Sequence, residues 1–271
     1  MFKKIFACEW QRLWLKKSTW LCLIIIPLVV FASLKSYLGV NKIVNITDPK
    51  YTSFANCAVA ALQEQLLIFF NMIVIFLTTL SITQEFRSGE IRFILLRTNS
   101  PCKLFFAKFL TINLTVALFL LIYFLSSYAL GYFMLPKLDK IHIFYHNTDF
   151  NFQAAFSYSV KYYLIALLTL IAMSCIVSFI CAMSKSVSIA IGLSLGVFLG
   201  MLAYPTAVIL FLYRFKIELL QMFSLTQIQF EGIAKFLGAS SLPYIIPIIF
   251  IYMIIFFVAN IIFYSKADQI Y

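Results

Sequence analysis

The sequence predicts an all-α integral membrane protein, and three observations indicate this class. Of the 271 residues, 63% are apolar and only 11% are charged, which excludes an ordinary water-soluble domain. Six intervals without a charged residue are 17 to 30 residues long, and about 20 apolar residues suffice to cross a bilayer. None of them alternates in pieces of about ten residues, as β-barrel strands do. The intervals are residues 18–34, 65–84, 109–136, 162–184, 186–213 and 236–265.

These six intervals are expected to be transmembrane helices, because backbone amides in lipid must be satisfied within their own segment. The sequence contains no internal repeat, no low-complexity tract and no soluble-domain composition. We therefore expect residues 1–271 to form a single membrane domain.

The segment before the first span, residues 1–17, combines apolar and basic side chains at helical spacing. Its apolar members are Phe2, Ile5, Phe6, Leu13 and Trp14. This pattern predicts an interfacial helix lying in the headgroup plane. The alternative is a positively charged topology signal without an ordered helix.

The distribution of basic residues predicts the orientation. With the amino terminus in the cytosol, 12 basic residues fall on inside segments and 9 on outside loops, and five lie directly before the first span. An even number of spans then places the carboxyl terminus in the cytosol too. We expect a multi-pass protein of the cell membrane whose basic residues meet anionic lipid, with no nucleic acid as partner.

Two polar residues fall in or near the second span. Glu64 lies toward its outer end and Asn71 near its middle. Because such groups are costly in lipid, they face protein or water, and both are candidates to line a pathway. The alternative places Glu64 at the interface and gives Asn71 an interhelical hydrogen bond.

The fifth span contains three glycines four residues apart, Gly192, Gly196 and Gly200. Glycines at this spacing share one helix face and let a second backbone approach closely. The spacing predicts tight helix packing, either within the chain or with a second chain.

Residues 214–242 are too polar to span a membrane and too apolar for a free loop. A re-entrant or surface-lying external hairpin before the last span is the simplest interpretation.

Motifs for chemistry on this chain are missing. The sequence has no P-loop, no Gly-x-Ser-x-Gly elbow and no His-Glu-x-x-His motif. The only histidines, His142 and His146, have zinc-like spacing but lack a third ligand in the pattern, so we expect no metal site and no enzyme.

The segment between the second and third spans is unusually rich in charge and amphipathic pattern. Ile91, Ile94 and Leu95 share one helical face, and Ser100 followed by Pro101 is a helix-start signal. Residues 85–100 are therefore expected to form a short cytosolic coupling helix that presents its charged face to a soluble protein. The alternative is a membrane anchor only.

The run Glu85…Gly89…Leu95-Leu96…Pro101-x-Lys103…Lys108 resembles the coupling-helix region of type-2 ABC exporter permeases. The interfacial helix, the six spans, the hairpin before the last span and the tail 263–268 are similar as well, so the resemblance covers nearly the full length. Gly89-Glu90 departs from the Gly-Thr of much of the family, which leaves the subfamily open. The size resembles that of small bacterial permeases that expel antimicrobial or other amphipathic peptides.

The resemblance implies that other chains supply the ATP hydrolysis and the second half of the pathway. Two permease chains, identical or related, would pair around a pathway, and two cytosolic ATPase subunits would bind ATP and magnesium, so that this chain holds no cofactor. Glu85 and Gly89 belong to the motif itself, and Ile91, Ile94 and Leu95 would hold the coupling helix against its own domain. The residues implied to meet the ATPase are Arg87, Glu90, Arg92 and Arg97.

Two other functions remain open from the sequence. One is a membrane scaffold or immunity protein that binds a toxin without an ATPase. The other is an ion-coupled secondary carrier, for which Glu64 is the sole candidate carboxylate.

Overall fold

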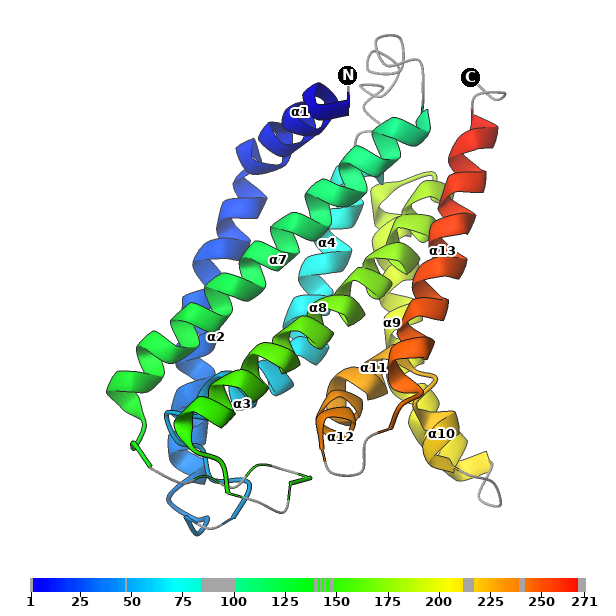
Figure 1. Cartoon of the computed structure of the whole chain (residues 1–271). Helices are drawn as coiled ribbons and strands as arrows, with labels where there is room; N and C mark the ends of the chain where they lie inside the picture. The colour runs from blue at the N-terminus through cyan, green and yellow to red at the C-terminus, as the bar shows by residue number, and fades with distance from the viewer. Residues whose placement is uncertain are drawn as a thin grey trace.

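The computed structural model of the chain describes residues 2–46, 48–83, 101–138, 141, 143, 145–146, 149–211, 217–238 and 242–267 (Figure 1). Six helical segments in these ranges are long and apolar enough to cross a membrane. This confirms the predicted class of an all-α integral membrane protein with six spans. The segments are α2 (Lys17–Val40), α3 (Cys57–Gln65) continuing through η1 (Leu66–Phe70) into α4 (Asn71–Ser81), α7 (Pro101–Met134), α8 (Phe152–Met183), α9 (Val187–Phe211) and α13 (Ile245–Ala267).

Four spans differ from the charge-free intervals at their starts. The second, third and fourth helices begin at Cys57, Pro101 and Phe152, before residues 65, 109 and 162. The charged residues Glu64, Lys108 and Lys161 therefore lie inside these helices. An interval defined by the absence of charge ends at any ionisable residue, even where the helix itself continues past that residue. The last helix begins at Ile245 and not at residue 236, because α12 ends at Leu237 and the turn residues Pro243 and Tyr244 directly precede the span.

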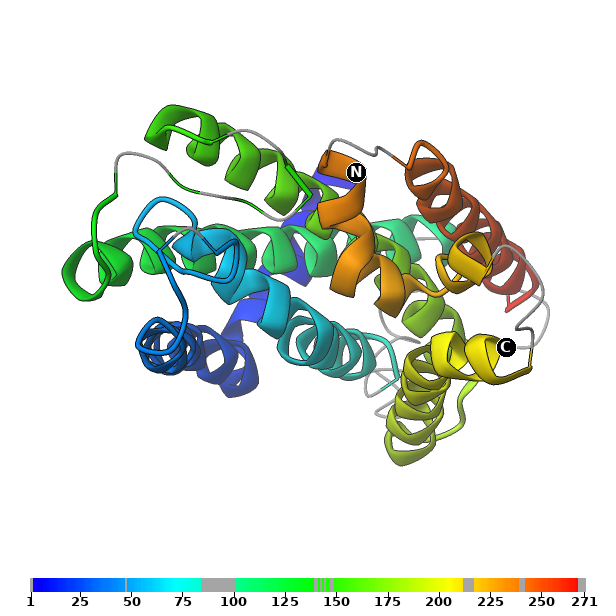
Figure 2. The same ribbon diagram turned by 90° about the horizontal axis from the view of Figure 1, so that it is seen from below.

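Helix α8 is the central helix of the bundle. In its most apolar stretch 67% of the residues are buried inside the chain, against 17% for α9 and 22% for α2. It packs against α4 on one side and α13 on another, and α7 passes beside it (Figures 1 and 2). The outer helices therefore leave most of their apolar surface to lipid or to a partner.

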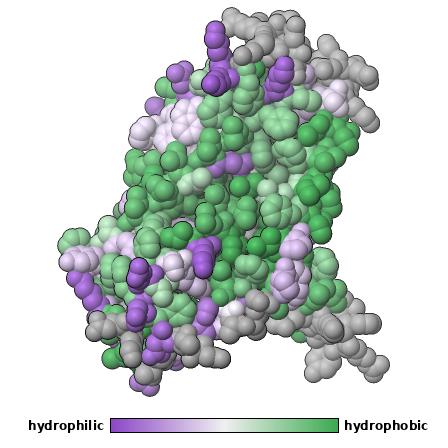
Figure 3. All heavy atoms as spheres, viewed as in Figure 1, coloured by the Kyte–Doolittle hydropathy of each residue, from purple (hydrophilic) through white to green (hydrophobic). Residues whose placement is uncertain are grey.

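The molecule has two polar ends. We call the end with α1 and the carboxyl-terminal end of α13 the terminal face, and the end with residues 41–56 and the short helices after α9 the opposite face (Figure 1). Hydrophobic residues dominate the middle of the surface in Figure 3, and hydrophilic residues gather toward both ends. This banded surface fits a bilayer between the two faces.

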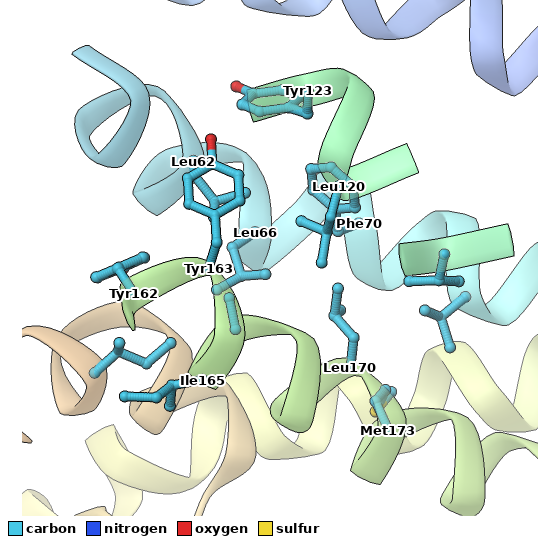
Figure 4. Close-up of a cluster of buried hydrophobic side chains, with 14 of the residues drawn as sticks. Leu62, Leu66, Phe70, Leu120, Tyr123, Tyr162, Tyr163, Ile165, Leu170 and Met173 are labelled. Atoms are coloured by element: carbon cyan, nitrogen blue, oxygen red, sulfur yellow. The ribbon is translucent and has the colours of Figure 1, made fainter. Parts of the chain in front are cut away.

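The core between α3, α7 and α8 is built from large apolar and aromatic side chains (Figure 4). Leu66, Phe70 and Tyr162 are fully buried there. The hydroxyls of Tyr123 and Tyr163 donate to the α3 carbonyls of Ala61 and Ala58, at 2.9 and 3.0 Å. These bonds fix α3 against two neighbouring helices, because a buried hydroxyl without a partner is costly.

The amino-terminal segment forms α1 (Phe2–Leu15), which a break at Lys16 separates from α2. Its buried residues are Ile5, Glu9 and Leu13, which recur every fourth position and so share one face. This face packs against α7, where the ring of Trp14 meets that of Phe119 at 6.2 Å. An ordered helix is therefore present, and its location at the membrane interface stays a prediction.

The described part of the predicted hairpin is a chain of short helices. They are α10 (Ile217–Gln221), α11 (Leu225–Gln227), η2 (Ile228–Gly232) and α12 (Ile233–Leu237). The hydroxyls of Ser224 and Thr226 donate to the Met201 carbonyl of α9 at 2.7 and 2.8 Å, and α12 packs against α8. The segment thus folds back onto the spanning helices, which explains its half-apolar composition.

One close approach between helices allows a direct test of this packing. A Cβ atom on Gly131 of α7 would lie 2.7 Å from Cys57 Sγ, whereas one on Gly192 would meet nothing within 4 Å. We expect Gly131→Ala to destabilise the chain by about 1–3 kcal/mol, the range for overpacking. Helix propensity alone would favour alanine at both sites by about 1 kcal/mol.

The measurement is unfolding of the purified chain in mixed micelles with increasing SDS. Gly192→Ala is the matched control and should be neutral or stabilising. Adding Cys57→Ala to Gly131→Ala removes the obstructing sulfur and should recover most of the loss. Equal stability of the two single variants would contradict the packing described.

Candidate functional site

The predicted coupling helix lies outside the described residues. This applies to all nine of its candidate residues: Glu85, Arg87, Gly89, Glu90, Ile91, Arg92, Ile94, Leu95 and Arg97. The structure does describe the two places where that segment joins the bundle, the end of α4 and the start of α7. Both lie at the terminal face (Figure 1).

A buried ion pair joins α1 to α7 at this face. Lys108 Nζ of α7 lies 2.7 Å from Glu9 Oε2 of α1, and the two side chains are only 1% and 3% exposed. The same Nζ donates to the carbonyl oxygen of Ser81 at 3.3 Å. Arg12, half-buried one turn along α1, lies 3.7 Å from the other Glu9 oxygen. One ammonium group therefore contacts both α1 and the last residue of α4.

A second lysine binds the end of α4. Lys16, at the break between α1 and α2, donates from Nζ to the Leu80 carbonyl at 2.8 Å. The last carbonyls of a helix have no partner within it and carry its partial negative charge, so cations are favourable there. Lys16 from this break and Lys108 from α7 thus satisfy adjacent carbonyls, those of Leu80 and Ser81. We call Glu9, Lys16, Lys108 and these two carbonyls the root clamp.

The root clamp holds three helices in one geometry. A charge taken out of water must keep its partner, and removing one member of such a pair costs about 3–5 kcal/mol. A displacement of α7 must therefore carry α1 with it or separate buried charges, and a displacement of α4 must break the hydrogen bonds from Lys108 and Lys16. This arrangement can transmit a force applied to the segment between α4 and α7.

The sequence analysis missed Glu9 and noted Lys108 only as part of a motif. A usable signal was present, because Glu9 is the only acidic residue among the first 47 and lies four residues from both Ile5 and Leu13. That spacing puts it on the apolar face of α1, where a carboxylate requires a partner. Which lysine would be the partner depends on how α1 crosses α7.

The other candidate residues of the second span lie in different surroundings. Glu64 is exposed and lines a cavity at the opposite face, described below. Asn71 is 1% exposed, and its Nδ2 donates to Gln229 Oε1 at 2.6 Å and to the Leu67 carbonyl at 2.9 Å. Gln229 Nε2 in turn donates to Thr169 Oγ1 of α8 at 3.2 Å. Asn71 therefore joins α4 to η2 and α8 in this conformation.

Gln229, which the sequence analysis missed, lies in an unusual part of the backbone. It belongs to the π-helical turn η2, and η2 packs against the other π-helical turn of the described chain, η1, directly before Asn71. Single π-helical turns occur often at functional sites, because they shift the register of a helix locally. The buried amide pair fixes these two turns against each other.

The three glycines of α9 face away from the described part of their own chain. A Cβ at Gly192, Gly196 or Gly200 would meet nothing within 4 Å. Their stripe therefore does not serve packing within the described chain, which leaves lipid or a second chain as its neighbour.

A metal site has no support in the described residues, where no three potential ligands come together. His142 lies outside those residues. His146 contacts the rings of Phe150 and Tyr158, and its burial lowers the pKa of the imidazole below the usual value.

Comparison with known protein families gives one result. The family model described as ABC-2 family transporter protein matches residues 5–203, which include most of α1, the root clamp, residues 85–100 and the first five spans through most of α9. A search of curated proteins found no match.

The root clamp can be tested by a double-mutant cycle on Glu9 and Lys108. Glu9→Gln and Lys108→Met should each lower the free energy of unfolding, because each removes the opposite charge that lies 2.7 Å from a buried charged group. Lys108→Met should cost less, since Arg12 remains beside Glu9. The coupling energy should be about 1–3 kcal/mol, as for residues in direct contact.

The measurement is SDS unfolding of the four proteins in mixed micelles. Lys103→Met is the matched control, because Lys103 is exposed on the same helix about one turn earlier. Additive single effects would show that the pair does not act as a unit.

Proposed function

Because this chain belongs to the ABC-2 transporter family, we propose that it exports an amphipathic or hydrophobic substrate, driven by a separate cytosolic ATPase. The chain itself is a membrane-spanning permease subunit of an ABC transporter and not the catalytic subunit. A peptide, such as an antimicrobial one, is the substrate that the size of the chain favours. ATP and magnesium would bind to the partner.

The observation that carries this proposal is the root clamp. A permease without nucleotide chemistry needs a mechanical path from the ATPase to its spans, and residues 85–100 connect the two helices that the clamp holds together. Movement of that segment would reach α4 and α7 directly and α1 through Glu9. An ATPase can shift the balance of conformations only by binding them differently, and this end of the bundle offers the contacts to do so.

A lateral groove supports the proposed class of substrate. It lies between α2, α4 and α9, has a volume of about 330 Å³ and is lined by apolar side chains such as Leu21, Phe69, Ile73, Phe76 and Leu195. A groove with this lining favours an apolar or amphipathic molecule that arrives from the bilayer and not from water.

The glycine stripe of α9 supports pairing with a second permease chain. An apolar helix gains little by leaving lipid unless its backbone can approach a partner closely, and small residues permit this. The spacing of Gly192, Gly196 and Gly200 allows such an approach, and no atom of the described part of the chain occupies the space beside them. The partner is an identical chain or a related one.

We place the protein in the cell membrane with both termini in the cytosol. The charge bias near the first span supports this orientation. It also places the root clamp where a cytosolic ATPase could reach it, and the cavity that contains Glu64 on the outside.

Charge reversal in the coupling segment tests the proposed function. In the complex reconstituted with its ATPase, Arg87→Glu combined with Glu90→Arg should lower the ATPase activity that the permease stimulates by at least about tenfold. A loss of contacts to charged groups at this interface would account for that size. The stability of the permease should not change, because Glu9, Lys16 and Lys108 of the root clamp are not substituted.

The control for that experiment is Lys42→Glu, a reversal at an exposed site on the opposite face. Full stimulation by the Arg87/Glu90 variant would argue against the proposed docking. Recovery of the tagged chain from native membranes without any P-loop ATPase would favour the scaffold function.

Pairing through α9 is tested by Gly196→Leu. The added side chain should separate two close helices and reduce dimerisation at least about tenfold, measured by energy transfer between labelled chains in liposomes. Ile254→Trp on α13 is the control, because Ile254 is 61% exposed on another outer helix. Equal energy transfer in both variants would exclude the stripe as the interface.

A further inference from the structure

The opposite face contains a cavity that the proposed function does not use. Its volume is about 320 Å³, and it lies between α2, α3, α8, the π-helical turn η2 and the loop after α2. The side chains that give it chemical character are Tyr37, Lys50, Gln63, Glu64, Tyr158 and Phe230. Smaller aliphatic and polar residues of α2, α3, α8 and the adjoining loops complete the walls. This size is at the lower end of that of small-molecule sites.

The cavity is a built feature of the bundle and not a gap between loops. The hydroxyl of Tyr37 donates to the Ala60 carbonyl at 2.9 Å, which fixes α2 against α3. Gln63 Nε2 donates to the Phe230 carbonyl at 3.1 Å, which fixes α3 against η2. Phe230 is next to Gln229, whose amide pairs with the buried Asn71. One lining residue of the cavity is therefore adjacent in sequence to a buried polar contact.

Two opposite charges line this cavity without neutralising each other. Glu64 is exposed although it lies inside a spanning helix, about 10 Å along the axis from Cys57. Lys50 is exposed at the loop. In the parts of the chain that the structure describes, neither has an ion-pair partner within 4.0 Å. A carboxylate on a spanning helix is costly unless it serves a ligand, a partner or water.

From this arrangement we propose that the cavity binds a zwitterionic ligand with an apolar body. Its ammonium group contacts Glu64, beside the aromatic rings of Tyr37 and Tyr158, which also attract cations. Its anionic group, a phosphate or carboxylate, contacts Lys50. A phosphoethanolamine lipid headgroup and a short free peptide both have this chemistry. The site is independent of the ATPase and goes beyond the proposed function.

The test measures ligand binding to the purified full-length chain in maltoside detergent by native mass spectrometry. The probes are two zwitterions, dodecylphosphoethanolamine and the free dipeptide leucyl-leucine, and two ligands whose charge has one sign only, dodecyl phosphate and dodecylammonium. We expect at least one zwitterion to bind at least about tenfold more tightly than both one-sign ligands, a difference of about 1.4 kcal/mol. Binding of the phosphoethanolamine alone assigns a lipid headgroup, and binding of the dipeptide assigns a peptide.

Glu64→Gln and Lys50→Gln should each raise the dissociation constant of the zwitterion at least about tenfold. The matched controls are Glu231→Gln, whose carboxylate pairs with Lys235 at 3.0 Å, and Lys42→Gln, and neither residue lines the cavity. Both controls should bind as the unmodified chain does. Three results would overturn the proposal. They are unchanged affinity in both cavity variants, binding of the one-sign ligands as tight as that of the zwitterions, and no binding of either zwitterion. None of these results depends on a coupled ATPase, so the proposed function would stand or fall separately.

Discussion

The buried contact between Glu9 and Lys108 is the constraint on which the terminal face depends. Both side chains are almost fully removed from water, so their charges stabilise the fold only while they remain together. Because Lys108 also bonds the Ser81 carbonyl, the pair fixes the end of α4 as well as α1 and α7. The segment that should meet the ATPase is therefore anchored at both of its ends in one charged cluster.

The two helices that leave this cluster connect it to the rest of the molecule. Helix α7 runs about 50 Å toward the opposite face, where its Gly131 packs directly on Cys57. Helix α4 begins directly after η1 with Asn71, which donates to Gln229 of the short helices after α9. Close packing and a satisfied amide pair are both sensitive to small shifts. Movement at the terminal face can therefore change the packing near the cavity on the other side.

Much of this fold could be predicted from the sequence, because a bilayer imposes length and apolarity on each span. The six spans and the helical class follow from charge-free intervals alone. The starts of the second, fourth and last spans could not be predicted in this way. Glu64 and Lys161 lie inside helices that continue past them, and α12 ends at Leu237 without a charged residue to mark the boundary. The partners of Glu9 and of Asn71 could not be predicted from the sequence either, because they depend on which helices pack against each other. The glycines of α9 were recognisable as a packing face, but only the structure excludes the described chain as their partner.

The central claim is that the ion pair between α1 and α7 transmits work from the ATPase to the spans. Its most direct test is charge exchange, measured as permease-stimulated ATPase activity of the reconstituted complex. Glu9→Lys and Lys108→Glu alone should each abolish stimulation, and the double exchange should restore part of it, limited by repulsion between a carboxylate and the Ser81 carbonyl. Full stimulation in either single variant, or no recovery in a folded double variant, would contradict this account.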